Sequence, residues 1–160
     1  MWQRQLLCLF WLLAMAASTH AKPCEKWLRI FKRAGVTPPK ATSDTDFFEA
    51  AECLLSAQGG TGPSEISGAT TPNVSQVLPR ASVQLAALYY LSFLFTENWS
   101  HASGIALWDD EGRINPEGST QRAFAAYRTW LKEVKKVGLA RAKKSGLNPL
   151  LGSGLLWYGN

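Results

Sequence analysis

The chain contains few of the side chains that most often carry out catalysis or bind metal ions. Its 160 residues include only two histidines, His20 and His101, and three cysteines. No second histidine and no acidic cluster stands at ligand spacing near the cysteines, which argues against a zinc site. His101, the histidine that remains after the N-terminal segment discussed below, is far in sequence from every cysteine, so a catalytic thiol has no base nearby. We therefore expect no metal ion and no cofactor.

The sequence also lacks a hydrophobic run long enough to cross a membrane, which requires about 20 apolar residues. Its first apolar run, Leu6 to Ala17, is shorter and follows the positively charged Arg4. The segment then ends in Thr19-His20-Ala21, an order typical of a secretory signal peptide cleaved after a small residue. We predict a signal peptide at 1–21 and an exported protein, either secreted or periplasmic. Cleavage after Ala16 and a retained membrane anchor are the alternatives.

The scarcity of cysteine predicts a single covalent cross-link. Removal of residues 1–21 takes Cys8 away and leaves Cys24 and Cys53. In an oxidising compartment, an even pair of cysteines in a small protein is typical of a disulfide. In the chain-entropy model, closing a loop of this length contributes about 3.6 kcal/mol to stability. Two separate buried thiols are the alternative. Residues 22–160 are expected to form one domain.

The spacing of apolar residues predicts that this domain begins with two helices. An amphipathic helix is expected from Pro23 to about Gly35. A second helix begins near Ser43 and places Phe47 and Leu54 on a bulky stripe, with Cys53 on a separate strip of small residues. The second helix should therefore pack on two sides, against the first helix through Cys53 and against the core through Phe47.

The most hydrophobic segment, Ala81 to Phe95, predicts a buried central helix. It is apolar almost all round and shorter than a membrane span, so neighbouring helices must bury it. A short helix capped by Asn98 and reaching Ala106, and a long helix capped by Ser119, are expected to follow. The expected fold class is therefore an all-α, single-domain bundle of about four to five helices around this segment, with one disulfide.

Three segments are expected to lack regular structure. Residues 58–76 are rich in Gly, Ser, Thr and Pro, which predicts a flexible loop, and they lack the Gly-Lys-Ser/Thr ending of a phosphate-binding loop. Residues 109–115 form a polar turn, but calcium-loop spacing fails because Gly118 stands where the bidentate glutamate belongs. The tail at 146–160 is expected to be irregular, with its aromatic end packed on the core.

Positive charge is concentrated in one part of the chain. Without the signal peptide, sixteen Lys and Arg residues stand against twelve Asp and Glu residues, a net charge of +4. Eight of these cations, and one acidic residue, lie between Arg122 and Lys144. On the long helix, four of them line the side away from the apolar stripe and are our predicted binding residues: Arg128, Lys132, Lys135 and Lys136. Such a surface suits an acidic protein, an anionic polymer or an anionic lipid, and ordinary solvation is the alternative.

A second candidate region surrounds the expected short helix. Trp99 and Trp108 flank this helix and could form an aromatic rim for a peptide or glycan, with packing in the core as the alternative. Glu97, His101 and Asp109 lie around the same helix and are weak candidates for an acid–base site.

Together these features favour an exported protein-binding module over an enzyme. An inhibitor or immunity-type protein of the cell envelope is the first hypothesis, and it rests on analogy with other small exported helical proteins. Export argues against a nucleic-acid partner. Binding of an envelope polymer or anionic lipid through the basic helix faces is the alternative. A second alternative is an envelope hydrolase centred on Glu97, His101 and Asp109.

Overall fold

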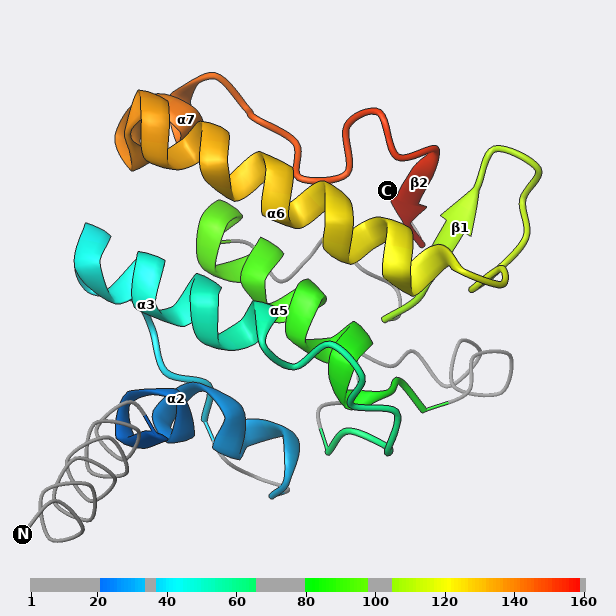
Figure 1. The fold of residues 1–160 in the computed structure, drawn as a ribbon, viewed down its shortest axis with the longest axis horizontal. Coiled ribbons are helices and arrows are strands. Elements are labelled where there is room, and N and C mark those ends of the chain that lie inside the picture. The colour runs from blue at the N-terminus through cyan, green and yellow to red at the C-terminus, as the bar shows by residue number, and fades with distance from the viewer. Residues whose placement is uncertain (1–20, 34–36, 66–79, 98–104, 159–160) are drawn as a thin grey trace, which may run out of the picture.

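The computed structural model describes residues 21–33, 37–65, 80–97 and 105–158. Within these ranges the chain is mostly helical, with five α-helices and one two-stranded sheet (Figure 1). The elements in chain order are α2 (Ala21–Leu28), the 3₁₀ helix η1 (Arg29–Phe31), α3 (Asp44–Leu55), α5 (Val83–Thr96), β1 (Leu107–Asp109), α6 (Ser119–Val137), α7 (Leu139–Lys144) and β2 (Leu155–Trp157). The mostly helical fold agrees with the prediction in part, and the small two-stranded sheet is a feature that the prediction lacks. Apart from Ala21, the predicted signal peptide lies outside the described residues.

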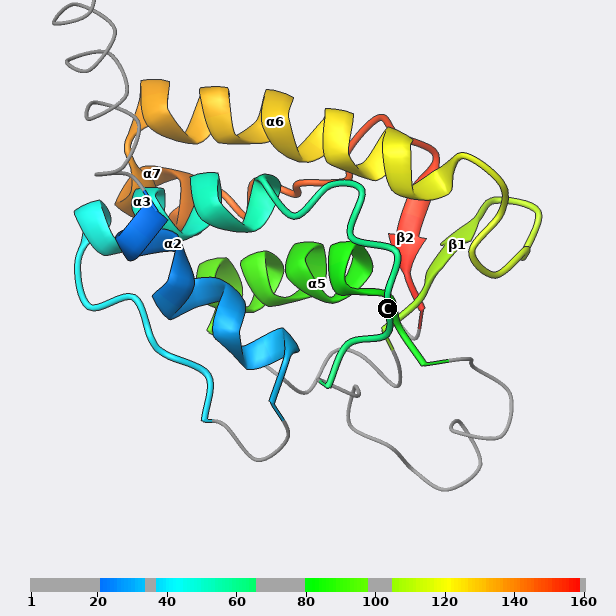
Figure 2. The same ribbon diagram turned by 60° about the horizontal axis from the view of Figure 1, so that its bottom comes forward.

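Helix α5 lies at the centre of the hydrophobic core, as its composition predicts. Ten of its residues between Leu85 and Phe95 are buried. It packs against α3, α6 and η1 (Figure 2). The helix begins at Val83, slightly later than predicted, because the Ser82 hydroxyl accepts a hydrogen bond from Leu85 N (3.4 Å) and so caps the first turn.

A disulfide joins α2 to α3, which confirms the prediction from the cysteine pair. Cys24 and Cys53 are bonded, and their Cα atoms lie 5.1 Å apart. On its other side α3 contacts the core, where the ring of Phe47 packs against Phe95 of α5 and Trp130 of α6. The predicted packing of α3 on two sides is therefore also confirmed.

The sheet joins two segments that the sequence predicts to be helical or irregular. Strand β1 pairs antiparallel with β2, so that Leu107 opposes Trp157 and Trp108 opposes Leu156. Ala106 is therefore not part of a helix, and Asn98, the predicted cap of that helix, lies outside the described residues. Each strand has three residues. Such a strand is too short to show the alternation that identifies strands, and its partner is distant in sequence, so local sequence gives no signal.

The chain around α6 differs from the prediction at both ends of the helix. Ser119 is the first helical residue instead of the cap; it is buried, and its N–H donates to the carbonyl of Pro116 (2.9 Å). After α6, the short helix α7 forms where the sequence shows only a basic run. The tail at 146–160 is not wholly irregular because it contains β2, although the buried Trp157 confirms that its aromatic end packs on the core.

The first part of the predicted loop at 58–76 is held against the core. Ser64 N donates to the carbonyl of Ala81 (2.9 Å), and Glu65 N donates to the carbonyl of Phe31 (2.9 Å). Gly60 lies so close to α5 that an added Cβ would come within 3.2 Å of the Val83 side chain. Residues 66–76 lie outside the described residues.

Replacing both cysteines, in the variant Cys24→Ser/Cys53→Ser, should lower the free energy of unfolding by about 3.6 kcal/mol. The reason is that the unfolded chain regains the freedom of a loop spanning 29 residues. Urea denaturation followed by tryptophan fluorescence measures the difference. Reductant should destabilise the wild-type protein by a similar amount and leave the variant unchanged, and a wild-type protein insensitive to reductant would contradict the prediction.

Candidate functional site

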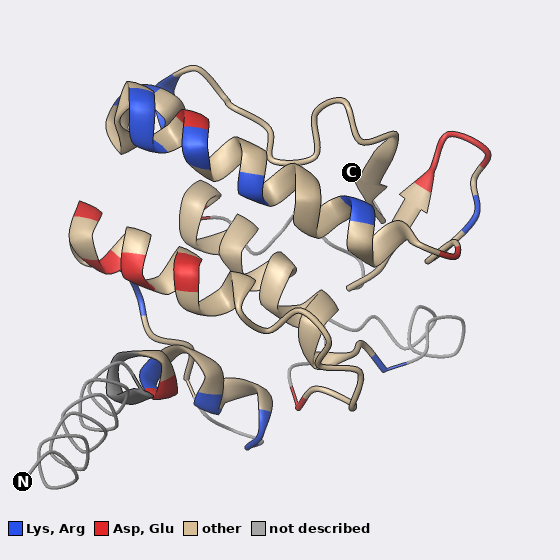
Figure 3. Ribbon diagram, viewed as in Figure 1, with Lys and Arg blue, Asp and Glu red and all other residues tan. Residues whose placement is uncertain are grey.

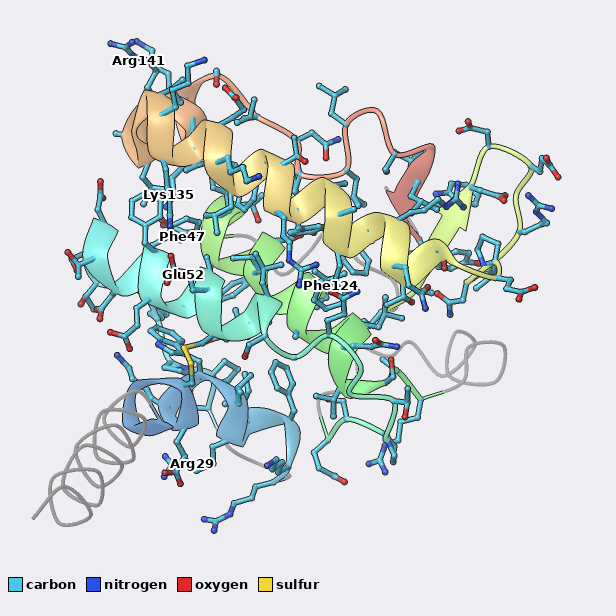
Figure 4. All side chains as sticks on the ribbon, in the orientation of Figure 1. Arg29, Phe47, Glu52, Phe124, Lys135 and Arg141 are labelled. Atoms are coloured by element: carbon cyan, nitrogen blue, oxygen red, sulfur yellow. A yellow bond between two sulfur atoms is a disulfide. The ribbon has the colours of Figure 1, made fainter. Side chains whose placement is uncertain are left out.

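Two residues of the predicted basic stripe on α6 contact α3 and do not face only solvent. Lys135 Nζ lies 2.5 Å from Glu52 Oε1 on α3 (Figure 4). It also lies 5.9 Å from the ring centre of Phe48 on the same helix. Arg128 donates a hydrogen bond to the carbonyl of Leu55 at the end of α3 (3.4 Å). Two of the four predicted binding residues on this helix therefore connect α6 to α3.

The acidic residues of α3 supply counter-charges to the helices on either side. Figure 3 shows them between the basic residues of α2 and those of α6. The contacts are an ion pair of Asp46 with Lys26 (3.5 Å), a hydrogen bond from Trp27 Nε1 to Glu49 (3.1 Å) and the ion pair of Glu52 with Lys135. Because these pairs are exposed to solvent, each contributes little to stability. The chain thus contains the acidic partner for part of its own basic surface.

Several cations of this region have no acidic partner within the described part of the chain. Lys136 approaches Glu133 at 3.8 Å. Lys132, Arg141 and Lys144 are exposed and form no ion pair with any described residue. Arg141 points away from the molecule at the α7 end (Figure 4). We call Lys132, Arg141 and Lys144 the free cations.

The two acid–base candidates that the structure describes do not lie together. Glu97 Oε1 is 2.5 Å from Lys143 Nζ on α7, and Asp109 Oδ2 is 2.7 Å from Arg113 in the turn after β1. Helix α7 and strand β1 lie at opposite ends of the molecule (Figure 1). Hydrogen bonds from these cations lower the pKa of both carboxyl groups, so both are ionised at neutral pH and neither is prepared to act as a general acid. His101 lies outside the described residues.

Trp108 lies on the outer face of the small sheet. It opposes Leu156 on β2, and Ile114 forms a bridge to it from the other side. The ring of Tyr158 packs edge-on against it, with ring centres 5.8 Å apart. The Trp108 indole N–H is buried and has no hydrogen-bond partner among the described residues. Trp99, the other member of the predicted aromatic rim, lies outside them.

A groove that the sequence does not predict runs along α6. Its volume is about 530 Å³. One wall is a side of α6 formed by Arg122, Ala125, Ala126, Thr129, Trp130 and Glu133, and the other wall is the segment 147–153. At 100° per residue, this side of the helix is turned away from Arg128 and Lys135, which contact α3. Most of the lining residues are half-buried or exposed, so the groove is open to solvent.

The segment 147–153 is fixed to the core at both ends. At its start, the indole N–H of Trp130 donates to the carbonyl of Leu147 (3.0 Å). Just beyond its end, the indole N–H of Trp157 donates to the hydroxyls of Ser92 and Tyr127, both at 3.1 Å, and these two hydroxyls bond to each other. Burial raises the pKa of Tyr127, so this hydroxyl stays protonated at physiological pH.

Hydrogen bonds within the segment also define its shape. Asn148 accepts from Leu150 N (2.8 Å), and the Ser153 hydroxyl donates to the carbonyl of Leu150 (2.6 Å). Leu150 is buried, whereas Leu151 next to it is 77% exposed. These hydrogen bonds constrain the shape of the second wall.

Two sequence signals are related to this groove. Ala125, Ala126 and Thr129 are small residues on the outward part of an otherwise basic helix. Gly152 and Gly154 have φ values of 75° and 66°, a conformation that favours glycine and lets the tail turn beside α6. These small residues and glycines form a groove only because the tail lies against α6, and that contact is visible only in the folded structure.

No protein-family model matches the chain, and no curated protein or solved structure is significantly similar to it. Across the described ranges, no group of three or more His, Cys, Asp or Glu side chains could hold a metal ion. None of the described helices has the length and hydrophobicity needed to cross a membrane. The function has to be inferred from the geometry of this chain alone.

The variant Trp157→Phe should lower the free energy of unfolding by about 1–3 kcal/mol, because the buried Tyr127 hydroxyl and the half-buried Ser92 hydroxyl lose their shared indole donor. It should also accelerate hydrogen exchange in residues 147–153, since the second wall loses one of its two attachments. Chemical denaturation and hydrogen-exchange mass spectrometry measure the two effects. Leu156→Ala, at the exposed neighbouring position, serves as the control with little effect. Faster exchange spread evenly over the chain would argue against a local attachment.

Proposed function

We propose that the protein is an exported protein-binding module, and that the groove beside α6 holds a segment of its partner. The groove is the observation that carries this proposal. It combines apolar and small lining residues with a few polar groups, as protein–protein interfaces combine an apolar centre with a polar rim. Its walls are fixed by hydrogen bonds from Trp130 and Trp157, so little conformational entropy is lost on binding.

The openness of the groove favours a protein segment over a small molecule. Sites for small molecules enclose most of the ligand surface. Here Ala125, Thr129 and Leu151 are exposed along the groove, so a small ligand would remain largely in contact with water. A protein segment that also contacts the surface around the groove would cover the exposed Leu151 side chain and remove its apolar surface from water.

Export is supported by the N-terminal apolar run and by the disulfide between Cys24 and Cys53. An exported module with a prepared groove suits an inhibitor or immunity-type protein, which must bind one partner tightly. This narrower role rests on analogy, and identification of the partner decides it.

The variant Ala126→Trp should abolish partner binding, because the indole ring fills the groove. Ala140→Trp, which adds the same ring at an exposed position of α7 outside the groove, is the matched control. Affinity capture from the exported protein fraction of the source cells should recover one stoichiometric protein with the wild type and with Ala140→Trp, but not with Ala126→Trp. Equal thermal melting of all three proteins excludes misfolding. Capture that Ala126→Trp leaves intact, or recovery of lipid or glycan alone, would contradict the proposal.

A second candidate function is binding to an anionic polymer or lipid surface, and the free cations favour it. Replacing all three, in Lys132→Glu/Arg141→Glu/Lys144→Glu, should remove binding to vesicles containing phosphatidylglycerol. Binding of the wild type should weaken strongly between low and moderate salt, because exposed charges are screened. Vesicle co-sedimentation measures both effects. If the wild-type protein does not bind these vesicles at low salt, this second candidate function is wrong.

A further inference from the structure

We infer that the groove takes an extended stretch of about five residues of the partner chain, with a carboxylate at the Arg122 end and apolar side chains in the middle. This inference rests on the proposed function and adds the chemistry of the bound segment. It follows from three properties of the groove: its length compared with its volume, the charges at its two ends and the side chains between them.

The dimensions of the groove favour an extended chain. Arg122 and Glu133 mark its two ends on α6. A helix rises 1.5 Å per residue, so these positions are separated by about 16 Å along the axis, which an extended chain spans with about five residues. A bound helix of this length, about 10 Å across, would occupy roughly 1,250 Å³. That is more than twice the 530 Å³ of the open groove, so a helix would lie over the groove with most of its volume outside, whereas an extended backbone whose intervening side chains face solvent can lie within it.

The charges at the two ends differ, and this difference gives the bound segment a direction. Arg122 is exposed and forms no ion pair with any described residue, and the carboxylate of Asp110 lies nearby without pairing with it, since Asp110 Oδ2 and Arg122 Nη1 are both within 4.0 Å of where a Cβ at Gly154 would stand. Its planar guanidinium can bind a carboxylate through two parallel hydrogen bonds. At the other end, Glu133 has only the 3.8 Å contact with Lys136. An acidic residue is therefore favoured next to Arg122 and disfavoured next to Glu133.

The positive electrostatic potential of the surrounding helices also favours an acidic segment. Between Arg122 and Lys144 the sequence has eight basic residues and one acidic residue. Two of these cations, Lys135 and Lys143, are paired with acidic residues from other elements. The remaining excess of positive charge attracts acidic chains and accelerates their association.

The middle of the groove selects apolar side chains. Small residues of α6 leave space above Trp130, and Pro149 and Leu151 line the facing wall. In an extended chain, every second side chain points to the same side. Apolar residues at alternate positions of the partner segment should therefore enter the groove, while the intervening side chains face solvent.

Selection from a random peptide library displayed on phage, against the immobilised disulfide-bonded protein, tests the inference without assuming a partner. Enriched peptides should carry Asp or Glu at one end of a short stretch with alternating apolar residues. The variant Arg122→Glu should bind these peptides about tenfold more weakly, and selection against it should enrich Lys or Arg at the same position. Lys132→Glu is the matched control, because it makes the same charge change on α6 outside the groove.

The outcomes separate this inference from the proposed function. Enriched peptides that Ala126→Trp no longer binds, but that show no acidic preference or show helical spacing of apolar residues, would overturn the inference and leave the groove as a binding site. Equal weakening by Arg122→Glu and Lys132→Glu would also overturn it, because the general field and not Arg122 would then recognise the carboxylate. Binding that Ala126→Trp leaves unchanged would contradict the proposed function itself. A selection that enriches no peptide would overturn the inference.

Discussion

Helix α5 is apolar on every side, so it is stable in water only where other elements cover all of its faces. Helix α3 covers it through Phe47, which contacts Phe95, and α6 covers it through Trp130, which contacts the same ring. The C-terminal strand reaches α5 as well, because the Trp157 indole bonds to Ser92. The disulfide then adds α2 to an arrangement that the burial of α5 already requires.

The candidate site follows from this same arrangement. The Tyr127 hydroxyl lies in the core with the half-buried Ser92 hydroxyl bonded to it, and such groups are costly to bury unless they are hydrogen-bonded. The Trp157 indole satisfies both, and in doing so it holds the end of the segment 147–153 beside α6. The groove therefore exists because the hydrogen bonds to these two hydroxyls fix the C-terminal tail beside α6. A partner bound in the groove would contact the segment 147–153, which these core contacts already position.

The sequence predicts the basic stripe on α6 correctly, but it does not predict the partners of its residues. The basic stripe on α6 exists as predicted, but Arg128 and Lys135 use their charge to contact α3. The acidic residues of α3 form their own pattern in the sequence, and nothing local indicates that the two helices face each other. Glu97 and Asp109 show the same limit, since they are close in sequence yet lie at opposite ends of the molecule, each with its own cation.

The sequence alone determined the features that follow from the local spacing of apolar residues or from the number of cysteines. Helices α3 and α6 repeat their apolar residues over several turns, and α5 is apolar along nearly its whole length. Two cysteines outside the predicted signal peptide allow one intramolecular disulfide. Tertiary structure decided the sheet, the partners of the basic residues and the groove. Each of these depends on contacts between segments distant in the chain, and a strand of three residues or an exposed alanine such as Ala125 has no local pattern that would reveal them. The free energy that places these segments comes from burying α5, which is a property of the whole chain.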